Sequence, residues 1–154
     1  MIATLNKIIS RGVKIFQRSL DDQLIFRARR GDLQEVRRLL ANKQINVNAK
    51  DYYYGQTALH KAAMYGVVEL VQELLQKGAN LNAKDDYGNT PLMLATVIRN
   101  EKIVRELLSQ EGIEVNVKNN DGSTALTLAV NGRNIEIARL ITSHIDPSGN
   151  IVVA

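Results

Sequence analysis

Apolar residues in the middle of the chain recur at intervals of three and four, in short segments that come in pairs. Within residues 55–84 the first segment carries Leu59, Ala62 and Ala63, and the second carries Val68, Leu70, Val71, Leu74 and Leu75. This spacing predicts two short amphipathic helices. Gly66 and Gly78 follow the two segments, where a glycine with left-handed backbone commonly ends a helix. The pattern therefore predicts two helices joined by a tight turn.

The same unit occurs three times. The segment GQTALHKA at 55–62 returns as GNTPLMLA at 88–95 and as GSTALTLA at 122–129, so the period is 33 residues and then 34. Its threonine favours a helix start, because the hydroxyl can accept a hydrogen bond from a free N–H of the first turn. Periods of this size are typical of stacked units that bury their apolar sides against one another. We therefore expect an all-α solenoid that presents a surface, and not a globule that encloses an active site.

The complete repeat has a recognisable form. Gly-x-Thr-Ala-Leu-His-x-Ala-Ala is followed by Glu-Leu-Val-x-x-Leu-Leu-x-x-Gly-Ala-Asn-Leu-Asn-Ala, and this combination resembles the ankyrin repeat. The resemblance covers roughly residues 21–142 and implies an ankyrin-repeat solenoid with short β-turn or hairpin tips. It implies four repeats, the outer two acting as caps, at about 21–50, 51–84, 85–118 and 119–146, followed by a tail at 147–154.

The later repeats depart from the family pattern at two places. Arg99 and Arg133 stand where the family usually has the glycine between the two helices, and each is followed by an asparagine, which tolerates left-handed backbone better than most residues. Pro147 and Gly149 end any helix near the C-terminus. The apolar residues after them, 151–153, form either a small hydrophobic lid or a frayed tail.

Composition narrows the chemistry. The chain has 154 residues, 45% of them hydrophobic, and no cysteine, which excludes disulfides, a thiol nucleophile and cysteine-ligated zinc. No run approaches the ~18 apolar residues that a membrane-spanning helix requires. The net charge is +4, but residues 1–40 hold nine basic and four acidic side chains, whereas residues 41–154 hold eleven and twelve. The basic character therefore belongs to the N-terminal end.

The sequence offers no catalytic constellation. His60 falls where similar repeats use the ring to brace the turn, and His144 lies near a helix end, where a structural or incidental role is expected. Asp85 and Asp86 are interpreted as a solvated hairpin tip. The glycines occur once per turn and form no phosphate-binding loop, and no metal-ligand or nucleophile–base spacing occurs. We expect no enzyme activity, cofactor or metal.

The resemblance implies that a partner binds the turn tips and the exposed side of each first helix. On the first helices these positions are Arg29, Arg30, Met64, Tyr65, Val97, Ile98 and Asn131. At the tips they are Tyr52, Tyr53, Tyr54, Gln56, Asp86, Tyr87, Asn89, Asn120, Asp121 and Ser123. All five tyrosines of the chain belong to this set, and tyrosine is enriched at binding hot spots. We expect an aromatic and apolar groove with a basic end at Arg29 and Arg30.

Residues 1–20 have their own pattern. Ile2, Leu5, Ile9, Val13, Phe16 and Leu20 share one helical stripe, and the basic residues Lys7, Arg11, Lys14 and Arg18 share another. This N-terminal amphipathic helix could cap the first repeat, lie on an anionic membrane surface through its basic residues, or act as a mitochondrial presequence. Nucleic acid is a weaker option, since aromatic residues are few and no groove-reading motif occurs.

These observations predict a non-enzymatic protein–protein interaction module, an adaptor or an inhibitor. The alternative is a recruiter that residues 1–20 bring to a membrane surface or an organelle. We expect the protein to be cytoplasmic and monomeric in isolation. Delivery into a host cell by a bacterium, membrane association and a mitochondrial location remain open, since similar repeats occur in several settings.

Overall fold

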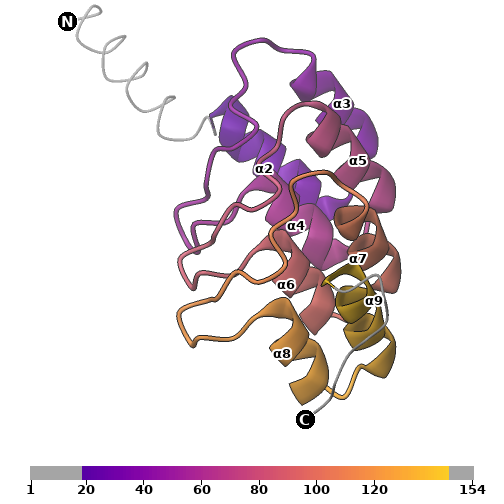
Figure 1. The fold of residues 1–154 in the computed structure, drawn as a ribbon. Coiled ribbons are helices and arrows are strands. Elements are labelled where there is room, and N and C mark those ends of the chain that lie inside the picture. Colours follow the sequence, from indigo (N-terminus) through magenta and orange to yellow (C-terminus); the bar gives the residue numbers. More distant parts are fainter. Residues whose placement is uncertain (1–18, 146–154) are drawn as a thin grey trace, which may run out of the picture.

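The computed structural model describes residues 19–145, in which eight helices and no strands occur. The helices form two layers, an inner layer of α2, α4, α6 and α8 and an outer layer of α3, α5, α7 and α9, with the tips projecting from one edge (Figure 1). This arrangement confirms the predicted all-α solenoid. The helices are α2 (Leu20–Arg30), α3 (Leu33–Leu40), α4 (Ala58–Tyr65), α5 (Val68–Gln76), α6 (Pro91–Val97), α7 (Glu101–Leu108), α8 (Ala125–Asn131) and α9 (Ile135–Ile145).

The inner helices of the last three repeats begin as the sequence predicts. Thr57, Thr90 and Thr124 each accept a hydrogen bond from the backbone N–H three residues later. These bonds satisfy a donor that has no partner within the helix. The threonine of the repeat motif therefore fixes where the chain leaves the tip and enters the inner layer.

The turns between inner and outer helices use a left-handed residue. In the first two repeats it is Gly31 or Gly66, and in the last two it is Arg99, with φ of 60°, or Arg133, with φ of 54°. The asparagines that follow these arginines do not take this conformation. Asn100 instead caps α7 by accepting a hydrogen bond from the Ile103 N–H. Each arginine thus carries backbone strain that glycine would avoid.

The core runs without interruption between the layers. Inner helices contribute small buried residues such as Ala62 and Ala95, and outer helices contribute larger ones such as Leu74 and Leu107. The last repeat is more open: Val130 is 59% exposed, although Ala63 and Thr96 are buried at the corresponding positions. The C-terminal repeat therefore leaves apolar surface uncovered among the described residues.

The first repeat begins one residue earlier than expected. Ser19 and Asp22 form a reciprocal capping box, so α2 starts at Leu20. The predictions for the rest of the N-terminal helix, including Lys7, Arg11, Lys14 and Arg18, and for the tail at 147–154 lie outside the described residues. Within residues 19–145 no helix is long and apolar enough to cross a membrane.

Candidate functional site

Each of the three tips is built around one Asp or Asn side chain. The Oδ1 atom of Asp85 accepts hydrogen bonds from the backbone N–H groups of Tyr87 at 3.0 Å and Asn89 at 2.8 Å. Asn119 makes the same two bonds two and four residues onward. Such side-chain bonds hold a tight turn without help from neighbouring strands.

The first tip has the same frame, meaning one side-chain oxygen that accepts from two backbone N–H groups, but it contains one more residue. Asp51 Oδ1 accepts from the N–H of Tyr54, three residues onward, and of Gln56, five residues onward. The insertion therefore lies between Asp51 and Tyr54. It displays Tyr52 and Tyr53, which are 95% and 81% exposed and touch edge to face.

Neighbouring tips are joined by side chains that the sequence assigned to the partner surface. Gln56 Nε2 donates to Asp85 Oδ2 at 3.1 Å, and Asn89 Oδ1 accepts from Asn119 Nδ2 at 3.0 Å. Asn120 Nδ2 donates to the Asp86 carbonyl. Gln56 is buried, and both ends of its amide are bonded within the protein, so it joins the tips in addition to lining the second cavity described below. Asn89 is half-buried and Asn120 is exposed. These two side chains therefore join neighbouring tips and also remain accessible to solvent.

The prediction that Asp85 and Asp86 are both solvated was right for only one of them. Asp86 is exposed, whereas Asp85 is 5% exposed and accepts from the Gln56 side chain and two backbone N–H groups. A buried carboxylate requires such partners. Asp85 is therefore part of the frame and is not a solvated group.

His60 braces two repeats, as predicted. Its Nδ1 accepts from the Thr57 N–H at 3.2 Å, and its Nε2 lies 3.0 Å from the Asn89 carbonyl in the next tip. A carbonyl can only accept, so Nε2 carries the proton and the ring is the neutral Nε2–H tautomer. Burial lowers the pKa of His60, and the bond to Asn89 and the charge of Asp85 oppose this only in part. The ring is thus a structural brace.

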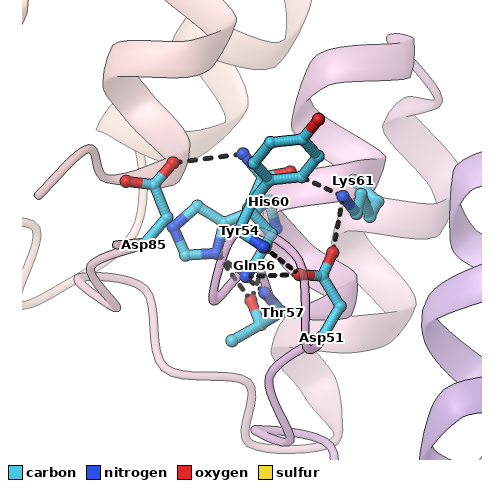
Figure 2. Close-up of polar contacts among 7 residues, drawn as sticks. All are labelled: Asp51, Tyr54, Gln56, Thr57, His60, Lys61 and Asp85. Atoms are coloured by element: carbon cyan, nitrogen blue, oxygen red, sulfur yellow. Dashed lines mark hydrogen bonds and ion pairs between the residues drawn. The ribbon is translucent and has the colours of Figure 1, made fainter. Parts of the chain in front are cut away.

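Lys61 forms a buried ion pair behind the first tip. Its Nζ lies 2.7 Å from Asp51 Oδ2 and donates to Gln56 Oε1 at 2.6 Å, and Figure 2 shows these groups converging beside the Tyr54 ring. Burial alone would raise the pKa of Asp51, but the hydrogen bond and charge of Lys61, with the tip N–H groups, hold it below its ordinary value. Nζ also lies 5.6 Å from the centre of the Tyr54 ring, within range of a cation–π contact.

Two adjoining cavities lie between α2, the first tip and α4. One, of about 450 Å³, is bounded by Ile25 and Phe26 on α2 and by the three tyrosines of the tip. The other, of about 400 Å³, is bounded by Met64 and Tyr65 on α4 and by Tyr87. Arg29, Tyr54 and Lys61 line both cavities, so we treat them as one aromatic groove divided by the Tyr54 ring.

The predicted partner residues divide into those inside and those outside this aromatic groove. Arg29, the tip tyrosines, Gln56, Met64, Tyr65 and Tyr87 line it. Arg30 lies beside it over the Phe26 ring. The remaining predicted residues line neither cavity. Of these, Asp86, Val97, Ile98, Asn120, Asp121 and Asn131 are exposed, and Asn89 and Ser123 are half-buried.

Sequence reasoning missed five residues of the groove, which are Asp22, Ile25, Phe26, Asp51 and Lys61. None of these was expected to face a partner. Phe26 and Lys61 occupy the same place in successive repeats, and both lie three residues before a predicted contact, Arg29 or Met64. Residues three apart share a helix face. Extending the predicted inner face back by one turn would have found Phe26 and Lys61.

The described residues hold no group of three or more His, Asp or Glu side chains that could bind a metal ion. Every buried side-chain nitrogen or oxygen among them has a hydrogen-bond partner. The polar groups at the tips are thus accounted for as joints of the structure.

A comparison with protein families supports this architecture. The family model described as ankyrin repeats (3 copies) matches residues 24–119. No match was found among curated proteins. Ankyrin repeats are in general protein–protein interaction modules, and the family is typically non-enzymatic. The match spans more than half of the chain and agrees with the helix pairs described above, so this chain belongs to the ankyrin-repeat family.

Proposed function

We propose that the protein is a non-enzymatic binding module, an adaptor or an inhibitor, that holds a protein partner against the aromatic groove and the neighbouring tips. The observation that carries this proposal is the gathering of four tyrosines, Tyr52, Tyr53, Tyr54 and Tyr65, beside Met64 on one exposed side. Each of these tyrosines is at least 49% exposed. Tyrosine supplies a large contact area at low cost in side-chain entropy.

The outer helices make a useful contrast. Their exposed polar side chains are paired between successive repeats: Arg37 with Glu73 at 2.7 Å, Gln72 with Glu106 at 2.8 Å, and Arg105 with Glu136 at 3.2 Å. Such pairs cover the outer layer with groups that already have partners in the protein. The tyrosine hydroxyls of the groove make no such contacts between repeats. This difference favours the inner side as the binding surface.

The test compares two triple variants of the full chain. The first, Tyr53→Ala, Tyr65→Ala and Ile98→Ala, removes three exposed apolar side chains from the inner side. The second, Glu69→Ala, Lys102→Ala and Ile135→Ala, removes three exposed side chains from the outer helices. Proteins captured from the source cell by each variant and by the unaltered chain are quantified by mass spectrometry.

We expect a set of proteins that the unaltered chain and the outer variant capture equally and the inner variant loses. Truncating residues at the centre of an interface typically costs 2 kcal/mol or more, about 30-fold in affinity. Circular dichroism and thermal unfolding would establish that both variants are folded. Undiminished capture by the inner variant would contradict the proposal.

The recruiter role proposed for the N-terminal residues needs a separate test. Its basis is the basic stripe of Lys7, Arg11, Lys14 and Arg18, which suits an anionic lipid surface. Since Ser19 caps α2, the truncation should remove only residues 1–18. Co-sedimentation with phosphatidylserine vesicles should fall on truncation if this role is correct. Equal pelleting of the two proteins would rule it out.

A further inference from the structure

Arg29 differs from the four arginines of the repeat domain that form ion pairs among the described residues. Arg27, Arg37, Arg38 and Arg105 are each within 3.2 Å of a carboxylate. Arg29 is exposed on the inner face of α2, lines both cavities of the aromatic groove, and makes neither an ion pair nor a hydrogen bond with any described residue. Its five N–H donors are therefore available to a ligand.

Three other charged side chains line the aromatic groove, those of Asp22, Asp51 and Lys61. Asp51 and Lys61 form the buried pair, so together they add no net charge. Asp22 accepts hydrogen bonds from Ser19 at the start of α2, seven residues before Arg29, which is about 10 Å along a helix. Asp22 lines only the cavity that contains Ile25 and Phe26, so Arg29 gives a local positive charge to the part of the groove beside α4.

The surroundings of Arg29 are apolar on one side. Ile25 and Phe26 lie on the preceding turn of α2, and the Tyr54 ring lies across from them in the same cavity. A side chain bound there would lose contact with water. An anionic neighbour on the same segment could then reach the guanidinium in a partly desolvated setting, where a charge-assisted hydrogen bond is stronger than in water.

We propose that the aromatic groove selects a peptide segment with an acidic side chain close to a large apolar one. The carboxylate binds Arg29, and the apolar side chain occupies the cavity formed by Ile25, Phe26 and Tyr54. In an extended segment, side chains two apart project from the same face roughly 7 Å from each other. The two residues are therefore within three positions of one another in the partner. This inference rests on the proposed function and adds the chemistry of the partner to it.

A nucleic acid fits the same groove less well. Tyrosine rings can stack on bases, and Arg29 could bind one phosphate. A strand that continued along the tips would pass the exposed carboxylates of Asp86 and Asp121. A polyanion is repelled there, whereas a peptide with one acidic residue is not. The charge pattern thus favours a peptide.

The test is selection of random twelve-residue peptides, displayed on phage, against the full chain. Enriched peptides are synthesised with a fluorescent label, and their dissociation constants are measured by anisotropy. The variants are Arg29→Gln, Arg29→Glu and Arg29→Lys. The matched control is Arg139→Gln, at an exposed arginine on α9 that also makes no ion pair with a described residue. Both sites are on the surface, and unchanged thermal unfolding would establish that each of the four variants is folded.

We expect enriched peptides to carry Asp or Glu within three positions of a large apolar residue. Arg29→Gln should weaken binding about 10-fold and Arg29→Glu further, whereas Arg29→Lys should stay within about 3-fold. Arg139→Gln should change nothing. A peptide with its acid changed to lysine should bind Arg29→Glu better than it binds the unaltered chain. Peptides without an acid preference, or equal binding by Arg29→Glu, would overturn the inference.

Failure of the proposed function has a different signature. If the proposed function is wrong, enriched peptides should bind the inner triple variant as tightly as the unaltered chain. The peptides would then bind elsewhere on the surface. A labelled twelve-nucleotide single strand tests the remaining ligand class. Binding of that strand in an Arg29-dependent manner, in competition with the peptide, would overturn the assignment to an acidic peptide.

Discussion

The first and third tips share a frame but differ in how they are anchored. In both, one side-chain oxygen, from Asp51 or Asn119, organises the turn. Behind the first tip lies a buried ion pair, and His60 reaches from α4 to the next tip. Behind the third tip, Thr127 stands in the place of His60, is exposed, and bonds only to its own cap residue, Thr124.

This difference indicates that the residues that anchor a tip differ from those that the tip displays, that is, exposes to a partner. The frame needs only one Asp or Asn oxygen and two backbone N–H groups, so a residue can be inserted without loss of the turn. The first tip carries the insertion and also has the buried ion pair of Asp51 and Lys61 behind it, which holds its tyrosines at the aromatic groove. The third tip has neither. The following predictions test whether anchoring and display are as separable as this comparison implies.

The largest effect is expected from removing the brace between repeats. His60→Ala should lower the free energy of unfolding by about 3–4 kcal/mol, because it creates a cavity, leaves the Thr57 N–H without its partner and removes one of the two donors to the Asn89 carbonyl. Thr127→Ala, at the same position in the last repeat, should cost only about 0.5–1 kcal/mol. Urea unfolding followed by circular dichroism measures both. Equal losses would mean that the two tips are anchored alike.

The buried ion pair should come next. Lys61→Met should cost about 2–3 kcal/mol, since it leaves Asp51 partly buried without its counter-charge. Adding Asp51→Asn should restore part of that loss. The exposed pair of Arg37 and Glu73 provides the control, and Arg37→Met should cost less than about 1 kcal/mol. If Lys61→Met is as mild as the control, the pair does not anchor the tip.

The pH dependence of stability should also report on the first anchor. Because the folded-state pKa of His60 is lowered, the unfolded chain takes up a proton first as the pH falls below about 6.5. Stability from this group is complete above that pH and is lost below it, with a slope of at most about 1.4 kcal/mol per pH unit. In His60→Asn the slope between pH 7 and 5 should be smaller. Identical slopes would show that burial of the ring is not coupled to folding.

Asp51 should act in a separate, more acidic window. Its folded-state pKa is lowered, so its contribution is present above the ordinary carboxyl range near pH 4 and is lost as the pH falls through the folded value. Urea midpoints between pH 5 and 2.5, compared with those of Asp51→Asn, would isolate it. The unaltered chain should lose more stability over this range than the variant does.

The sequence predicted the parts of the fold that repeat and missed those that join repeats. Thr57, Thr90 and Thr124 gave the helix starts correctly, because a cap depends on residues three positions apart. The bond between Gln56 and Asp85 was missed because it links residues 29 positions apart, and only stacking brings them together. Phe26 and Lys61 were missed for a local reason, since they lie one turn before predicted contacts on the same helix face.

The smallest effect on stability, with the largest effect on binding, is expected from shortening the first tip. Deleting Tyr53 would give this tip the length of the other two, a frame that already closes around Asp85 and Asn119. The free energy of unfolding should change by less than about 1 kcal/mol. A peptide selected against the full chain should bind at least 10-fold more weakly, since the deletion removes one exposed ring and redirects that of Tyr52.

The matched control is deletion of Glu111. This exposed residue lies in the connection between Leu108 and Asn116, which is one residue longer than that between Leu75 and Asn82. Both deletions therefore return a loop to a length that another repeat already uses, but only the first alters the aromatic groove. Loss of binding on deleting Tyr53 alone would separate display from anchoring. Comparable destabilisation and loss of binding in both deletions would mean that the length of any loop is transmitted through the stack, and the inserted tyrosine would then be a structural element.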